Sequence, residues 1–344
     1  MATQPQPSRS EPDSTKARVA SPARARAPGK IILSGEHFVV LGAPAVSMAI
    51  DFYSEAEVKP DEGKRVKIGV DVPLRFLAKS SRASRVTDSQ GFLQPLRIAA
   101  QATLDYIDRS AKGIDVNVDC EIPIAAGLGS SASTTVAIIS AVSKSLGVEL
   151  GRKEVFKLAF IPERFLHGKP SGVDQATCIY GGTIEFTRPS SVRPIQANND
   201  PLLLLCDTGI HHQTGRLVGS VVRKSRIDKE HFRDYLARAR EISRGVSKAL
   251  RAGDSEDLGS LMSQNHELLR KIGVSHPKLD RLVAGAKRAG ALGAKLTGAG
   301  GGGCIVAVCS NTKSRDKIAR ILSREGGTPY RISRDLRGVD AHFT

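Results

Sequence analysis

The sequence predicts an α+β fold of two domains, each of which combines strands with helices. Its 344 residues exceed the usual size of one domain. In the N-terminal half, apolar and polar residues alternate over residues 114–122, which is typical of a strand buried on one face, and a helical pattern follows over residues 131–146. The C-terminal half alternates strand and helix patterns: 202–206, 214–221, 230–252, 254–271, 277–289, 304–308, 315–323 and 330–333.

The composition is that of a soluble globular protein. Hydrophobic residues make up 40% of the chain, and no apolar run approaches the roughly 20 residues that cross a membrane. The five cysteines are scattered and form no C-x-x-C pair, so we expect buried, reduced thiols without a disulfide frame or zinc site. We therefore expect a cytoplasmic protein with no membrane partner.

The chain is strongly basic, with a formal net charge of +16. This charge suits anionic ligands such as nucleotides, carboxylated metabolites or nucleic acid. Aromatic residues make up only 4% and Trp is absent, whereas single-stranded nucleic acid is usually bound by stacking on aromatic rings. No nucleic-acid-binding motif is evident. We therefore expect a small-anion pocket and no nucleic-acid partner.

Residues 1–25 are rich in Pro, Ser, Gln and charged residues, which predicts a disordered basic tail. The segment lacks the apolar core of a secretory signal. Gly181 and Gly182 precede a strand over 183–187 and mark a seam between domains. We therefore predict an N-terminal domain over 26–185 and a C-terminal domain over 186–344.

Polar residues surround a short apolar strand at residues 31–33. Lys30, Glu36 and His37 are unusual neighbours for such a strand unless they line a cleft, although each alone also fits a surface or hydrogen-bonded side chain. The chain then reads as three strands, followed by a helix: strands over 46–51, 52–58 and 65–70, with a turn at 59–63, and a helix over 95–110.

A glycine- and serine-rich loop, residues 123–132, connects the strand at 114–122 to the helix at 131–146. Glycines let a backbone approach a ligand closely, and the N–H groups at a helix start attract an anion. The loop therefore fits a phosphate cradle, although not of the Walker type, which requires a following Lys. Read alone, it equally fits a flexible connector with Ser as the helix cap.

Two further segments carry candidate site residues. A helix over 152–166 contains Pro162, which is expected to kink or end it, and the tight loop after it leads to Asp174. Asp174 fits either a general base in a glycine-rich loop or an ordinary helix N-cap. Four consecutive glycines, 300–303, run directly into an apolar strand, which favours backbone packed against a ligand or another loop over a linker.

Together these segments resemble the signature motifs of the GHMP kinases (galactokinase, homoserine, mevalonate and phosphomevalonate kinases). Within that family the similarity is to the mevalonate kinase branch, over roughly residues 24–335. The matching segments are Pro28-Gly29-Lys30, Gly35-Glu36-His37 with Val39-Val40 and Gly42-Ala43-Pro44-Ala45, His167-Gly168 with Pro170-Ser171-Gly172-Val173-Asp174, Asp207-Thr208-Gly209 with Thr214, and Gly273-Val274-Ser275. The implied fold is an N-terminal α/β domain of the ribosomal protein S5 domain 2-like type and a C-terminal ferredoxin-like α+β domain, with the active site between them.

The resemblance implies a role for each matching residue. It assigns Asp174 as catalytic base with Lys30 beside it, and Ser131 and Glu163 as ligands of Mg²⁺. It assigns these residues to ATP binding: Pro123, Ala126, Gly127, Leu128, Gly129, Ser130, Ser131 and Ala132. It assigns these residues to the substrate: Lys30, Glu36, His37, Asp174, Thr214, Gly298 and Ala299.

The implied activity is Mg²⁺-dependent transfer of the γ-phosphoryl group of ATP to the 5-hydroxyl of mevalonate. Another GHMP kinase, acting on phosphomevalonate or homoserine, is the alternative, and a non-catalytic sensor on the same fold would not need Lys30, Glu163 and Asp174 together. Pro162 departs from the family pattern before Glu163, and the basic tail has no counterpart in the motifs. Whether the chain forms a homodimer stays open.

Overall fold

The structure is a computed structural model that describes residues 20–63, 65–71, 93–109, 112–123, 126–167, 170–210 and 214–344, without the side chains at 166–167 and 214–216. No helix in these ranges is both long and apolar enough to span a membrane. Residues 1–19 of the predicted tail lie outside the described residues. Residues 23–25, which were assigned to the tail, instead belong to the first strand, where they pair with strands on both sides.

The larger sheet has these strands: β1 (Ala23–Ser34), β2 (Ala45–Asp61), β3 (Val66–Asp71), β4 (Gly113–Cys120), β5 (Thr183–Thr187), β6 (Ser191–Pro194) and β11 (Asp340–Phe343). Its order is β11–β1–β2–β4–β3, and β5 pairs with β2 and β6. Only the β3–β4 pair is parallel in the described sheet.

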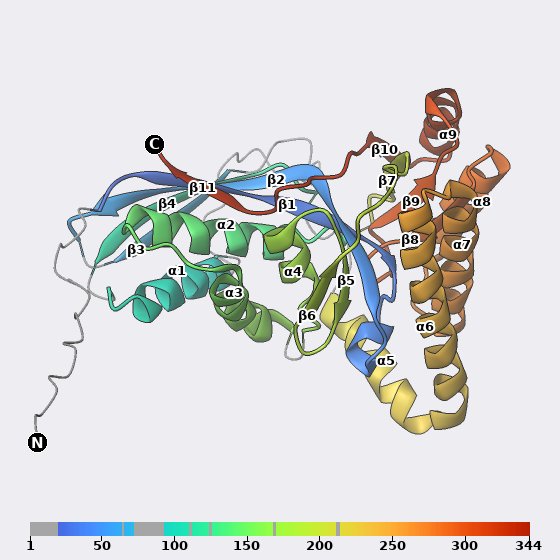
Figure 1. Cartoon of the computed structure of the whole chain (residues 1–344), viewed down its shortest axis with the longest axis horizontal. Coiled ribbons are helices and arrows are strands. Elements are labelled where there is room, and N and C mark those ends of the chain that lie inside the picture. The colour runs from blue at the N-terminus through green and yellow to red at the C-terminus, as the bar shows by residue number, and fades with distance from the viewer. Residues whose placement is uncertain are drawn as a thin grey trace, which may run out of the picture.

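Four helices lie along one side of this sheet (Figure 1): α1 (Gln94–Tyr106), α2 (Ser130–Ser145), α3 (Arg152–His167) and α4 (Val173–Tyr180). A short 3-10 helix, η1 (Phe38–Leu41), follows β1. Helix α2 packs on β1 and β2 and is buried almost all round. Its many Ala, Ser and Thr residues allow this close approach to the sheet. The packed helix therefore fixes the position at which the preceding loop ends.

The smaller sheet is antiparallel, in the order β10–β7–β9–β8. Its strands are β7 (Leu203–Asp207), β8 (Gly293–Leu296), β9 (Cys304–Val308) and β10 (Thr328–Arg331). The helices of this half are α5 (Thr214–Ile227), α6 (Lys229–Ala252), α7 (Ser255–Lys271), α8 (Pro277–Arg288) and α9 (Thr312–Arg324). Helices α7 and α8 pack on β8.

The two halves share one apolar core. A single cluster of buried side chains includes Ile31 and Leu33 of β1 together with Leu205 of β7 and Leu296 of β8. The chain also returns to the larger sheet at its C-terminal end, where β11 pairs with β1 (Figure 1). The domain boundary predicted between residues 185 and 186 falls inside β5. The end of the chain, predicted as part of the C-terminal domain, belongs to the larger sheet because β11 pairs with β1.

The predicted two-domain α+β architecture is confirmed, with two local corrections. The strands predicted over 46–51 and 52–58 are one strand, β2, which continues through the turn predicted at 59–63 as far as Asp61. The first half of β2 is buried on both faces and the second half on alternate residues, and this change in pattern looks like a break in the sequence. Pro162 does not end its helix, because α3 packs on α2 and α4 and continues to His167.

Candidate active site

A buried lysine and a partly exposed carboxylate form the centre of the candidate site. Lys30 lies on β1 with only 2% of its side chain exposed, and its Nζ is 3.1 Å from Oδ1 of Asp174. The same ammonium donates a hydrogen bond to the carbonyl of Gly127, at 3.1 Å. Asp174 reaches this position because α4 packs on β1. The N-cap of α4 is Gly172 and no side chain caps the helix, so Asp174 is not the N-cap.

The predicted phosphate loop lies directly beside this pair. The N–H of Lys30 donates to the carbonyl of Leu128 at 2.9 Å, which fixes the loop to β1. Helix α2 begins at Ser130, its first turn has no acidic residue, and its N-cap Gly129 has no side chain to occupy the first N–H groups. These N–H groups and the positive end of the helix dipole are thus available to an anion. Residues 124–125 of this loop lie outside the described residues.

Glu163 places a second carboxylate near Asp174. It lies on α3 and is partly buried. Burial raises the pKa of Glu163 to about 8, and the negative charge of Asp174 adds to the rise, while Lys30 and the nearby Gln175 amide oppose it. Both carboxyl groups lie near the Lys30 ammonium, and a cation bound beside them would favour the ionised form of Glu163.

The residues present fit a divalent cation that is shared with a phosphorylated ligand. Among the residues that the structure describes, no three His, Cys, Asp or Glu side chains gather into a metal site of their own. Mg²⁺ often takes only one or two protein oxygens and completes its shell with phosphate and water. The carboxylate of Glu163 and the hydroxyl of Ser131, in the first turn of α2, are donors of this type.

A second glycine-rich turn packs against the phosphate loop. A Cβ on Gly298 would lie 2.9 Å from Cα of Gly127, and a Cβ on Gly127 would lie 2.9 Å from the carbonyl oxygen of Thr297. Gly298 has φ of +84°, which a side chain rarely adopts. A Cβ on Gly303 would likewise lie 2.7 Å from the carbonyl oxygen of Ala126, so the glycine-rich segment packs against another loop, one of the two alternatives that the sequence favoured.

The remaining predicted site residues differ in their burial and in their hydrogen-bond partners. His37 is buried in a left-handed conformation, φ 62°, and its Nε2 lies 2.9 Å from the carbonyl oxygen of Ala299. Glu36 is only 1% exposed and both its carboxylate oxygens contact protein groups. Helix α5 begins at Thr214, whose side chain lies outside the described set. Pro123 is buried next to the loop.

Three polar residues near the site, Lys295, Asn265 and Gln175, were not predicted from the sequence. Lys295 and Asn265 are the partners of Glu36, and Gln175 lies beside Glu163. A lone lysine in the apolar strand before the glycine-rich turn was a usable signal for Lys295, since a charged residue is seldom fully buried without a partner. Asn265 and Gln175 lie within helices and carry no such signal.

An ammonium paired with a carboxylate, a glycine-rich loop at an uncapped helix start and a second carboxylate together suit phosphoryl transfer, which depends on alignment and charge neutralisation. The fold and this site define a small-molecule kinase. The family model described as "GHMP kinases N terminal domain" matches residues 95–182, and "GHMP kinases C terminal" matches residues 246–328.

Several known proteins of similar sequence and structure are mevalonate kinases. That of Pyrococcus furiosus is 37% identical over 325 residues, covering 90% of this chain and 96% of the relative. That of Methanocaldococcus jannaschii is 35% identical over 297 residues, covering 86% and 94%. The crystal structure of L. major mevalonate kinase in complex with R-mevalonate has a TM-score of 0.78 at 30% identity, covering 91% and 95%. The chain therefore belongs to the GHMP kinase family, as an ATP-dependent phosphotransferase related to the mevalonate kinases.

Proposed function

We propose that the protein transfers the γ-phosphoryl group of ATP to the 5-hydroxyl of mevalonate, giving 5-phosphomevalonate. The observation that carries this proposal is the contact between Lys30 and Asp174 beside the uncapped start of α2, in a chain whose relatives are mevalonate kinases. Neither group alone would indicate a reaction. Together they would supply a cation and a proton acceptor beside the proposed phosphate site.

The ATP phosphates would lie over the loop and the first turn of α2. Backbone N–H groups there would bind the phosphate oxygens, and the helix dipole would offset their charge. The residues that we assign to this function are Pro123, Ala126, Gly127, Leu128, Gly129, Ser130, Ser131 and Ala132. Ser131 and Glu163 would hold Mg²⁺, which neutralises charge on the phosphates when bound.

The acceptor hydroxyl would approach the exposed side of Asp174. The carboxylate would accept the hydroxyl proton as the phosphoryl group is transferred, or hold the hydroxyl in line. Lys30 would supply positive charge to the transferred group from the buried side. We assign His37, Thr214, Gly298 and Ala299 to the surroundings of the substrate.

All five cysteines are free and buried, which supports a reducing, cytoplasmic location.

The test is a coupled ADP-release assay with the purified full chain and Mg²⁺·ATP. The acceptors are mevalonate, phosphomevalonate, homoserine and galactose, each titrated separately. We expect turnover with mevalonate and a kcat/KM at least about 100-fold below it for each other acceptor. Turnover with another acceptor and none with mevalonate would overturn the substrate assignment and leave the kinase assignment intact.

A further inference from the structure

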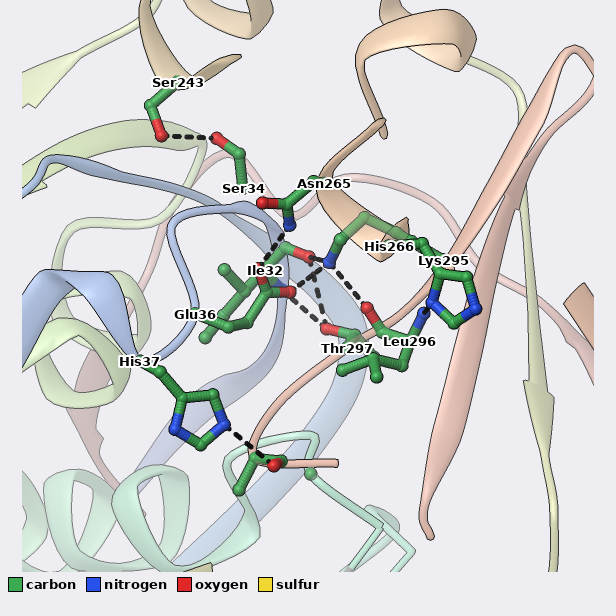
Figure 2. A network of polar contacts seen from close by, with 12 residues as sticks. Ile32, Ser34, Glu36, His37, Ser243, Asn265, His266, Lys295, Leu296 and Thr297 are labelled. Atoms are coloured by element: carbon green, nitrogen blue, oxygen red, sulfur yellow. Dashed lines mark hydrogen bonds and ion pairs between the residues drawn. The ribbon is translucent and has the colours of Figure 1, made fainter. Parts of the chain in front are cut away.

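Glu36 belongs to a network of polar contacts that is sealed from solvent (Figure 2). One carboxylate oxygen forms an ion pair with Nζ of Lys295, and the other accepts a hydrogen bond from the Asn265 amide at 2.8 Å. The side chains of Lys295 and Glu36 are 0% and 1% exposed. With both oxygens occupied and no exposed face, Glu36 has no obvious means of contacting a substrate.

The ammonium of Lys295 connects the two halves of the molecule. Besides Glu36, it donates hydrogen bonds to the carbonyl of Ile32 at 3.0 Å and to that of Leu296 at 2.5 Å. Ile32 belongs to β1 and Leu296 to the end of β8. Burial lowers the pKa of Lys295, and the charge and hydrogen bond of Glu36 oppose that shift. The three donors of the ammonium thus meet three acceptors, which a buried charge requires.

A second set of contacts joins the β1 segment to the residues that follow Lys295. The hydroxyl of Thr297 accepts a hydrogen bond from the N–H of Ile32 at 2.8 Å. The His37 ring is hydrogen-bonded to the carbonyl of Ala299 (Figure 2). The backbone of His37 is left-handed, with φ 62°. A left-handed backbone at a non-glycine residue persists only where its surroundings hold it. Here the preceding residue, Glu36, is fixed by the ion pair.

Both joined segments contribute residues to the candidate active site or contact its loop. Strand β1 carries Lys30, two residues before the Ile32 carbonyl that Lys295 binds. The segment after Lys295 reaches Gly298, which packs on Gly127, and the carbonyl of Gly127 accepts the hydrogen bond from Lys30. A change in the distance between β1 and the end of β8 would therefore move the phosphate loop relative to Lys30.

We propose that Glu36 and Lys295 are positioning residues: their buried ion pair fixes the glycine-rich turn 297–303 against β1 and the loop 126–129, and so sets Lys30 for phosphoryl transfer. The inference rests on the proposed function. It assigns Glu36 a role through Lys295 instead of a contact with the substrate. Net stability alone does not explain the pair, because buried ion pairs can often be replaced by apolar side chains without loss of stability.

The test compares Lys295→Met, Glu36→Gln and the double variant Glu36→Gln/Lys295→Met. Each single variant leaves an unmatched buried polar group, so we expect Tm to fall by roughly 5 °C or more. The double variant removes both charges and should regain at least about half of the larger loss. Its kcat should nevertheless stay at least about 10-fold below wild type, with KM for ATP within about threefold. Recovery of kcat in parallel with Tm would show that the pair serves stability only.

Glu36→Asp keeps the test decisive if the double variant does not fold. The shorter carboxylate keeps its charge but must draw Lys295 or the 36–37 turn toward it. We expect a folded protein, a kcat at least about 10-fold lower, and faster amide hydrogen exchange over 297–303. Wild-type kcat and wild-type exchange in Glu36→Asp would overturn the proposal.

Ser243→Ala is the matched control. Ser243 on α6 shares a buried hydrogen bond with Ser34 of β1, at 3.0 Å, and this bond also links the two halves but does not lead to the glycine-rich turn (Figure 2). The kcat of Ser243→Ala should match that of wild type. All kcat ratios are measured with whichever acceptor wild type phosphorylates, so failure of the mevalonate assignment shows in wild type alone and leaves the ratios interpretable.

Discussion

Lys30 Nζ and Asp174 Oδ1 lie 3.1 Å apart, with the lysine 2% exposed and the aspartate 31% exposed. One partner of the pair is therefore buried while the other opens toward the site. An acceptor can reach only the carboxylate side. This asymmetry supports the proposed division of roles, in which Lys30 would supply fixed positive charge from the buried side and Asp174 would meet the reacting hydroxyl.

Asp174→Asn tests the role of the carboxylate. The amide keeps the shape of the side chain but cannot accept the hydroxyl proton, so kcat should fall at least about 100-fold. ATP binding should change little, because the proposed phosphate contacts are backbone N–H groups of another segment. Steady-state kinetics and calorimetric titration with nucleotide measure the two effects.

The control for this variant is Asp234→Asn, at a 72% exposed aspartate on α6. It should leave both quantities unchanged. Near-normal kcat in Asp174→Asn would limit Asp174 to a structural role at the start of α4.

Gly298→Ala tests the contact between the two glycine-rich segments. The added methyl group would lie 2.9 Å from Cα of Gly127, so the phosphate loop must shift. We expect kcat/KM for ATP to fall at least about 10-fold in initial-rate measurements. Gly290→Ala is the matched control: Gly290 also has positive φ, 103°, but no atom lies within 4 Å of its added Cβ. Equal effects of the two substitutions would assign the loss to backbone strain and not to the loop.

The sequence predicted the fold well where a local pattern coincides with the final burial. Alternation over 114–122 and the small-residue helix after it correspond to β4 and α2, and the proximity of Lys30 to Asp174 follows from the family motifs. The glycine run beside the loop was also expected, because glycines next to a core strand require a close backbone neighbour.

Other features depend on contacts between distant segments and have no local pattern. The burial of Glu36 depends on its contacts with Lys295 of β8 and Asn265 of α7, which are distant in the sequence. The N-cap interpretation of Asp174 was wrong because α4 begins one residue before it, with Gly172 as the N-cap. Packing of α4 on β1 then brings the carboxylate to Lys30. The return of β11 to the larger sheet depends on its pairing with β1, and no periodicity in residues 340–343 indicates this pairing.

Asp335→Ala tests what holds this returning segment. The Asp335 carboxylate is nearly buried and accepts hydrogen bonds from the Tyr53 hydroxyl at 2.9 Å and from the N–H of Gly338 at 2.7 Å. Its removal should lower the free energy of unfolding by about 1–3 kcal/mol, because these donors lose their partner. Denaturant titration measures this loss, and kcat at low temperature should be unchanged.

The same variant has a spectroscopic readout. Burial raises the pKa of Tyr53 to about 12, and its hydrogen bond to Asp335 contributes to the rise. The pKa of Tyr53 should therefore move down toward its ordinary value in Asp335→Ala, as followed by phenolate absorbance. Asp340→Ala, at an exposed residue of β11, should change neither stability nor this pKa. An unchanged free energy of unfolding in Asp335→Ala would show that β11 pairing suffices to hold the segment.

Glu163 links pH to stability in the ligand-free protein. Its pKa is about 8 in the folded chain, against 4.5 for an ordinary glutamate. The folded state therefore binds more protons than the unfolded state between these two values. Its contribution to stability is fully present below about pH 4.5 and is lost as the pH rises through about 8.

Glu163→Gln removes this titration, because the amide stays neutral like the protonated acid. The difference in Tm between Glu163→Gln and wild type, measured without nucleotide, should therefore shift in favour of the variant as the pH rises from about 5 to about 9. Glu149→Gln, at an exposed loop residue, should show no such trend. With Mg²⁺·ATP present the order should reverse, since the proposed metal ligand is lost and the nucleotide stabilises wild type more. A difference in Tm that stays constant with pH would show that Glu163 is already ionised in the free protein.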